Sequence, residues 1–139
     1  NELYDSFVRI EGITDVAVED LAVPLGAYNA ETIEMAQKWY RSIRTTHPGI
    51  NTEANFNPFE LFSPSLRATS TIEDVEKYIQ EAKDQNGWLI LTYHQIDTSG
   101  DTYAVTPDAF RAHMQAVVNS GIDIVPYSRT LNLLKEQQQ

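Results

Sequence analysis

Two side chains suited to catalysis lie in β-prone segments of the chain. His94 is the last residue of an apolar run that begins at Trp88, and Arg44 lies within Ser42–Thr46. Ligands of parallel α/β folds bind at the carboxyl ends of strands, because loops and helix N-termini converge there. A histidine at such an end suits general acid or base chemistry, since imidazole titrates near neutral pH. His94 is therefore the strongest catalytic candidate, although on position alone a histidine bonded to a backbone carbonyl explains it equally well.

The other candidates have simpler structural explanations. Arg44 taken alone fits a surface ion pair, and His47 fits a turn residue before Pro48. His113 fits a partly exposed packing residue at the edge of a helix. The chain's three histidines are far apart in the sequence and lack the close pair that anchors most His-based metal sites. We therefore expect this chain to hold no metal by itself.

The composition narrows the class of protein. The 139 residues, 42% of them hydrophobic, fit a single globular domain that spans residues 1–139. The chain has no cysteine, which excludes disulfides and thiol nucleophiles, and it contains no GxGxxG, P-loop or GxSxG motif. A net charge of -10 opposes binding to nucleic acid or to an anionic membrane, and no apolar run is long enough to span a bilayer. Composition alone leaves the cellular compartment open.

Capping signals and apolar periodicity predict four helices. The first runs from Ala30 to Tyr40 after the N-cap Asn29, and the second follows a capping box at Ser70–Glu73 and stops at Asn86-Gly87. The remaining two are a helix from Thr106 to Gly121 and a last helix from Ser128 through Leu134. The predicted inner faces are Ile33, Ala36 and Tyr40; Ile72, Val75, Ile79 and Ala82; and Phe110, Met114, Val117 and Val118.

Four β-prone segments alternate with these helices. They are Leu21–Gly26, which ends in a turn, Ser42–Thr46, Trp88–His94 and Ile122–Pro126, and a long polar loop separates the second from the next helix. Trp88–His94 starts with four large apolar residues, which suits a strand covered on both faces. The alternation predicts an α/β fold with about four parallel strands, either a small open sheet or part of a barrel with an apolar flank left open.

Several strings in this order resemble polysaccharide deacetylases of the NodB-like family. The likeness runs from about Asp15 to Leu134. The strings are Val23–Asn29 before a helix, Arg44 before Pro48–Asn51, Trp88–His94 before Tyr103–Pro107, and the closing Gly121–Pro126.

The resemblance implies a distorted (β/α) barrel of which this chain is the C-terminal part. Enzymes of this family remove acetyl groups from N- or O-acetylated glycans with a divalent metal ion, commonly zinc. Such a metal lowers the pKa of its bound water to roughly 7 and polarises the acetyl carbonyl. The family also suggests an extracellular or cell-envelope location.

By the same resemblance, His94 corresponds to the general acid that protonates the leaving amine. Arg44 corresponds to the arginine that orients the catalytic aspartate. His47, Pro48 and Gly49 would line the substrate groove, and a backbone N–H there could face the oxyanion. These roles agree with the strand-end rule applied above.

The sequence departs from the family pattern in several places. The Phe-Asp-Asp-Gly motif and the paired histidines that hold the metal are absent, and we expect them upstream of Asn1. Thr92 stands where the family usually has a leucine of the acetyl pocket, so we count Thr92 among the substrate-binding residues. The family's Asp-and-Trp motif is not evident between Asn51 and Ser70. The chain alone is then expected to be inactive, with an acetylated oligo- or polysaccharide and the N-terminal half of the barrel, or a second copy, as partners.

Two other functions remain open on the sequence alone. The first is a non-catalytic, degenerate barrel module that dimerises through its open flank, binds glycan, or does both. The second is a small open-sheet α/β enzyme of another kind, which the lack of a nucleophile, nucleotide or metal motif disfavours.

Overall fold

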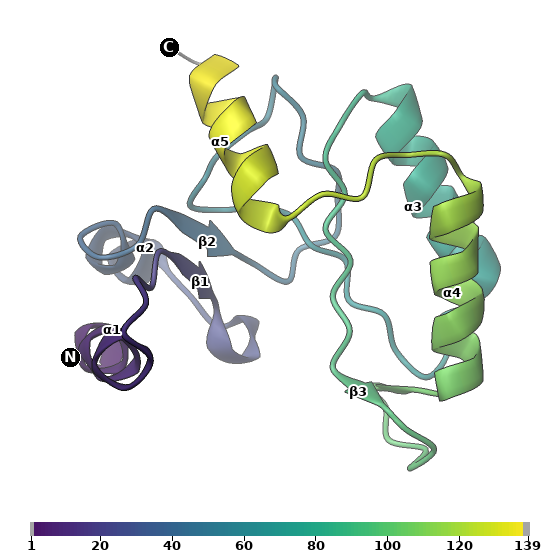
Figure 1. Cartoon of the computed structure of the whole chain (residues 1–139), viewed down its shortest axis with the longest axis horizontal. Helices are drawn as coiled ribbons and strands as arrows, with labels where there is room; N and C mark the ends of the chain where they lie inside the picture. The colour runs from purple at the N-terminus through teal and green to yellow at the C-terminus, as the bar shows by residue number, and fades with distance from the viewer. Residues whose placement is uncertain (1, 138–139) are drawn as a thin grey trace. The chain divides into compact units, whose positions relative to one another are not determined.

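The computed structural model describes residues 2–137, which form two compact units (Figure 1). The first unit holds the chain up to Thr46 together with Asn57–Leu61. The second holds His47–Phe56 and the chain from Phe62 onward. Each unit has its own apolar cluster, and each is described on its own below.

The first unit packs helices around a pair of parallel strands. Strands β1 and β2 pair in parallel, with Asp20 opposite Ser42 and Ala22 opposite Arg44. The buried cluster contains Val23, Ala36, Tyr40 and Ile43. The elements are α1 (Glu2–Thr14), β1 (Asp20–Ala22), the 3-10 turn η1 (Pro24–Gly26), α2 (Ala30–Ala36) and β2 (Ser42–Arg44).

Two helices of this unit differ from the sequence prediction. Asn29 caps α2 as expected, and its side chain accepts a hydrogen bond from the Thr32 N–H (2.8 Å). The helix ends at Ala36, so its predicted extension to Tyr40 is wrong, although Tyr40 is still buried. Helix α1 was not predicted; its Tyr4 ring lies 4.5 Å from the Trp39 ring.

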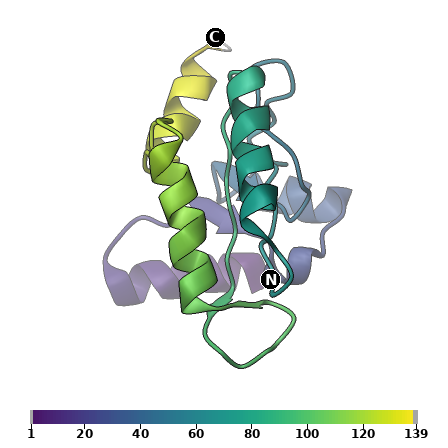
Figure 2. The same cartoon turned by 90° about the vertical axis from the view of Figure 1, so that its right-hand side faces the viewer.

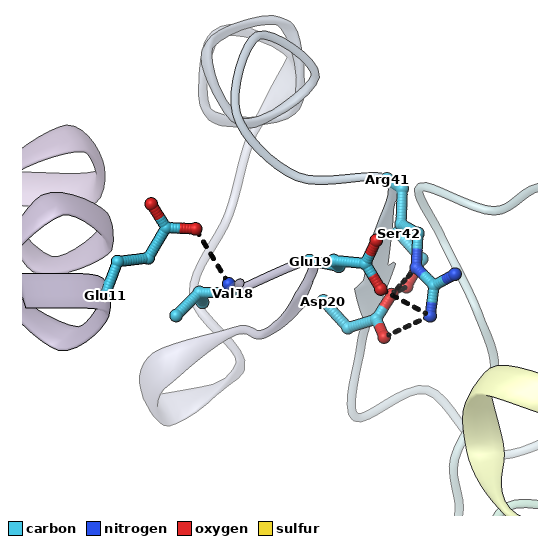
Figure 3. Close-up of polar contacts among 6 residues, drawn as sticks. All are labelled: Glu11, Val18, Glu19, Asp20, Arg41 and Ser42. Carbon is cyan, nitrogen blue, oxygen red and sulfur yellow. Dashed lines mark hydrogen bonds and ion pairs between the residues drawn. The ribbon is translucent and has the colours of Figure 1, made fainter. Parts of the chain in front are cut away.

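A polar cluster fixes the start of the β1–β2 pair (Figure 3). The Arg41 guanidinium donates to both carboxylate oxygens of Asp20, at 3.1 and 3.0 Å, and also lies 3.3 Å from Glu19. The Ser42 hydroxyl donates to Asp20 Oδ1 at 2.7 Å. Because a guanidinium matches a carboxylate in two-point geometry, this cluster sets the register at the first residue pair of the two strands.

The second unit is built around two helices that lie side by side, α3 and α4 (Figure 2). Its buried cluster consists of Leu66, Val75, Ile79, Val105 and Ala116. The elements are α3 (Ile72–Asp84), β3 (Gln95–Ile96), β4 (Ala104–Val105), α4 (Pro107–Asn119) and α5 (Tyr127–Gln137). Strands β3 and β4 pair in parallel.

The helix starts of this unit follow local capping chemistry. The capping box of α3 is formed by Thr71 and Asp74, one residue later than the predicted Ser70–Glu73 pair. Ser70 instead accepts the Arg67 N–H at 2.9 Å, so its hydroxyl is already engaged. Thr106 caps α4 as predicted, with Pro107 as its first residue. The predicted apolar face of α3 is confirmed at Val75, Ile79 and Ala82, which are buried, whereas Ile72 is exposed.

Two segments that were predicted as strands do not form strands in the structure. Trp88–His94 is extended but pairs only through isolated bridges, Trp88 with Asn51 and Thr92 with Ser65, and is partly buried rather than covered on both faces. Ile122–Pro126 forms no strand. A β-prone run becomes a strand only where another segment supplies its hydrogen bonds. Strands β1 and β2, which overlap two of the predicted segments, are parallel as expected, whereas β3 and β4 lie outside the predicted strands. The partial barrel stays a prediction.

The buried amide of Asn51 joins three segments of the second unit. Its Nδ2 donates to the carbonyl oxygens of Phe62 (3.0 Å) and Trp88 (3.2 Å), and its Oδ1 accepts the Phe62 N–H (2.9 Å). The Asn51 backbone also exchanges two hydrogen bonds with Trp88, at 3.0 and 2.7 Å. This side chain thus pairs both backbone groups of Phe62, which make no other hydrogen bond among the described residues.

We expect Asn51→Ala to lower the free energy of unfolding by about 2–4 kcal/mol, because it leaves the backbone N–H and C=O of Phe62 unpaired and removes one of the two hydrogen bonds to the Trp88 carbonyl. Asn119→Ala, on the exposed end of α4, is the matched control and should cost less than about 1 kcal/mol. Urea unfolding followed by Trp88 fluorescence in a Trp39→Phe background reports on the second unit. Equal losses in the two variants would contradict the role assigned to Asn51.

Candidate functional site

His94 is exposed at the end of the extended segment that precedes β3. Its ring lies 5.0 Å from the Tyr103 ring at an interplanar angle of 65°. Successive side chains of an extended segment point to opposite sides, so Tyr93 and His94 face in opposite directions. Tyr93 packs against the buried cluster of the second unit, which leaves His94 directed outward.

A buried histidine holds Tyr93 in place. His113 is 1% exposed, and its Nδ1 lies 3.2 Å from the Tyr93 hydroxyl. The Tyr93 ring also meets Phe110 edge-on at 4.9 Å. Burial raises the pKa of Tyr93 to about 12, so its hydroxyl stays protonated in its hydrogen bond with Nδ1 of His113. This contact anchors the segment that presents His94.

The predicted role of His113 as a partly exposed packing residue is therefore wrong. The sequence prediction placed Val118 on the inner face of the helix, but Val118 is exposed, and His113 and Ala116 are the buried residues of α4. Burial lowers the pKa of His113 below its usual 6.5, and this outweighs the opposing effects of the Ser70 backbone and the Asp74 carboxylate. The sequence feature that could have indicated this burial is the spacing of His113, which places a polar side chain among the apolar core positions of the helix.

The loop that contains His47, Pro48 and Gly49 belongs to the second unit, as His94 does. The His47 carbonyl accepts the Ser63 N–H at 2.8 Å, which ties the loop to the segment before α3. Gly49 has a φ of 153°, and a Cβ there would lie 3.0 Å from Cγ of Phe62. The positive φ and the close approach of Phe62 therefore favour glycine at this position. The side chains of His47 and Pro48 are exposed.

Thr92 is joined to the same loop through Ser63. The Thr92 and Ser63 hydroxyls are hydrogen-bonded to each other, and Ser63 Oγ also donates to the Ile90 carbonyl at 3.1 Å. The Thr92 backbone pairs with Pro64 and Leu66. The structure thus brings Thr92 and the His47 loop together through one buried serine, while the Thr92 hydroxyl takes part in segment pairing.

Arg44, the other predicted catalytic residue, lies in the first unit at the end of β2. Its carbonyl accepts the Val23 N–H at 3.1 Å, and its Nη1 lies 3.4 Å from the Thr45 carbonyl. The half-buried side chain is held close to its own backbone. The predicted site residues are accordingly divided between the units, with Arg44 in one and His47, Pro48, Gly49, Thr92 and His94 in the other.

Potential metal ligands do not cluster in the part of the chain that the structure describes. Within residues 2–137, no three His, Asp or Glu side chains come close enough together to hold a metal ion. The same range contains no helix that is both long and apolar enough to cross a membrane.

Comparison of the chain with protein-family models, with curated proteins and with solved structures gave no match.

We expect the stability of the second unit to fall as the pH drops from about 7.5 to about 5.5, a range in which most Asp and Glu side chains stay ionised. The unfolded chain takes up the His113 proton near 6.5, whereas the folded chain takes it up only at lower pH, so acid favours unfolding. His113→Gln should be less stable at neutral pH and lose less stability on acidification. The control His47→Gln, on an exposed loop, should keep the wild-type fall; an unchanged pH dependence in His113→Gln would contradict the assignment.

Proposed function

We propose that this chain supplies the general-acid side of a carbohydrate deacetylase site. The observation that carries the proposal is His94, an exposed imidazole at the end of an extended segment that Tyr93 and His113 anchor from the opposite side. A general acid must be held in one place and still reach its substrate, and this arrangement supports both requirements. The resemblance to NodB-like deacetylases supports the same assignment for His94.

In the proposed reaction, His94 donates a proton to the leaving group as the acetyl carbon separates from it. For an N-acetylated sugar, a water oxygen bonds to the acetyl carbon and loses a proton to a base outside this chain, the C–N bond breaks, and the proton from His94 goes to the nitrogen, so that the products are acetate and a free amine. For an O-acetylated sugar, the proton goes to the sugar oxygen. Attack on the acetyl carbonyl, and the divalent metal expected to assist it, belong to polypeptide other than this chain.

The other predicted residues have supporting roles in the proposal. Arg44 would orient an aspartate supplied from outside the chain, through a charge-assisted hydrogen bond. The exposed loop at His47 and Pro48 would line the groove for an acetylated oligo- or polysaccharide. Thr92 would contribute to that groove mainly by holding the loop, since its hydroxyl is bonded to Ser63.

The chain alone should release no acetate from acetylated chitooligosaccharide or acetylated xylan, and release should appear when the metal-binding half of a polysaccharide deacetylase is added. In the mixture, His94→Gln should lower the rate by about 10²–10⁴-fold, because it removes the proton donor. Arg111→Gln, an exposed change on α4, is the control and should keep the wild-type rate. Wild-type rates in His94→Gln, or no release in any mixture, would refute the proposal.

One observation favours a second function, a non-catalytic module that pairs with another copy of itself. Among the described residues, the backbone N–H and C=O groups of Asp123, Ile124 and Val125 make no hydrogen bond, and the Ile124 side chain is 69% exposed. Unpaired β-prone backbone is a template for strand pairing between chains. Two copies joined at this segment would satisfy those groups.

If that second function holds, sedimentation velocity should show a dimer whose fraction increases with protein concentration. Ile124→Lys should shift the protein to monomer, because the charge opposes strand pairing there. Ile13→Lys is the matched control: Ile13 is also exposed but lies on α1, and its replacement should leave the dimer intact. A monomer at all concentrations would exclude this function.

A further inference from the structure

Arg67, Tyr103 and His94 form an exposed cluster within the second unit. The Arg67 guanidinium carbon lies 5.1 Å from the centre of the Tyr103 ring, and the His94 ring lies 5.0 Å from the same ring. The first contact has the geometry of a cation–π interaction. The Tyr103 side chain is 43% exposed, so ligands can reach the cluster from solvent.

Strand register explains why these residues meet. Ser65 pairs in parallel with Thr92, so Arg67 and His94, each two residues further along, are neighbours on the same side. Gln95 pairs in parallel with Ala104, which likewise makes His94 and Tyr103 neighbours. The Ala68 N–H donates to the Thr102 carbonyl at 3.1 Å, and this bond holds the segment that contains Arg67 against the segment that contains Tyr103. The cluster is thus fixed by backbone pairing.

Arg67 keeps its charge available in a strongly acidic chain. Its guanidinium makes no ion pair or hydrogen bond with any residue between 2 and 137, although the sequence has 20 acidic side chains against 10 basic ones. The nearby loop carboxylates are already engaged: Asp97 accepts the Ser99 N–H and Asp101 accepts the Tyr103 N–H, both at 2.9 Å. The stack on Tyr103 therefore holds a guanidinium whose donors are unused among residues 2–137.

We propose that Arg67 and Tyr103 form a subsite for the carboxylate of a uronic acid residue, next to His94. The planar guanidinium binds a carboxylate through two parallel hydrogen bonds, and the exposed part of the Tyr103 ring offers an apolar surface to the sugar. This inference rests on the proposed function, because it names the class of glycan that would reach His94: an acetylated polysaccharide that carries uronic acid.

The test is to titrate the chain alone with xylotetraose and, separately, with xylotetraose that bears one glucuronic acid. Binding is measured by calorimetry and by the NMR signals of the His94 and Tyr103 rings. The uronic acid form should bind about tenfold more tightly or better, and Arg67→Gln should remove that difference. Arg67→Lys should recover only part of it, because lysine lacks the two-point geometry. Tyr103→Ala should weaken binding by removing the stack that holds Arg67.

Arg111→Gln is the matched control, since it deletes the same charge from an exposed site on α4. Equal binding of the two oligosaccharides, or equal losses in Arg67→Gln and Arg111→Gln, would overturn the subsite. Inorganic phosphate that binds at Arg67 as tightly as the uronic acid form would also overturn it, by showing a general anion site. If the mixture releases acetate but binding does not depend on Arg67, the subsite alone is overturned. If binding depends on Arg67 but the mixture releases no acetate, only the deacetylase function is overturned.

Discussion

The second unit depends on backbone groups of short extended segments finding partners. No long sheet supplies them, and the Asn51 amide takes that place by bonding to both backbone groups of Phe62 and to the Trp88 carbonyl. Ser63 does the same on a smaller scale between the Ile90 carbonyl and Thr92. Buried polar side chains of this kind stabilise the fold only when all their hydrogen-bonding groups have partners. Both Asn51 and Ser63 lie where two extended segments meet and backbone partners are available.

The presentation of His94 follows from that pairing. Once Thr92 is held by Pro64 and Leu66, the alternation of an extended chain sends Tyr93 inward and His94 outward. The hydrogen bond from Tyr93 to His113 then fixes the inward side chain, and the ring of Tyr103 limits the outward one. For the proposed general acid, a backbone held in this way lowers the entropic cost of orienting the His94 side chain.

Charge is distributed unevenly around this histidine. The chain as a whole carries a net charge of -10, yet the side chain stacked beside His94 through Tyr103 is an arginine, and the carboxylates of the adjoining loop bond to backbone N–H groups of their own turns. Negative charge on a ligand would be repelled by most of the surface and attracted at Arg67. A single accessible positive charge on an acidic surface favours binding of an anionic ligand at that charge over nonspecific binding to the rest of the surface.

The sequence by itself determined the local features: the caps at Asn29 and Thr106 and the helices α3 and α4 to within a residue or two. These follow from capping and periodicity, which act within one or two helical turns. Tertiary structure alone decided that Ile122–Pro126 forms no strand, that His113 is buried against Tyr93, and that Arg67 lies beside Tyr103. Each depends on which distant segment lies alongside, and neither β-propensity nor helical spacing specifies that neighbour.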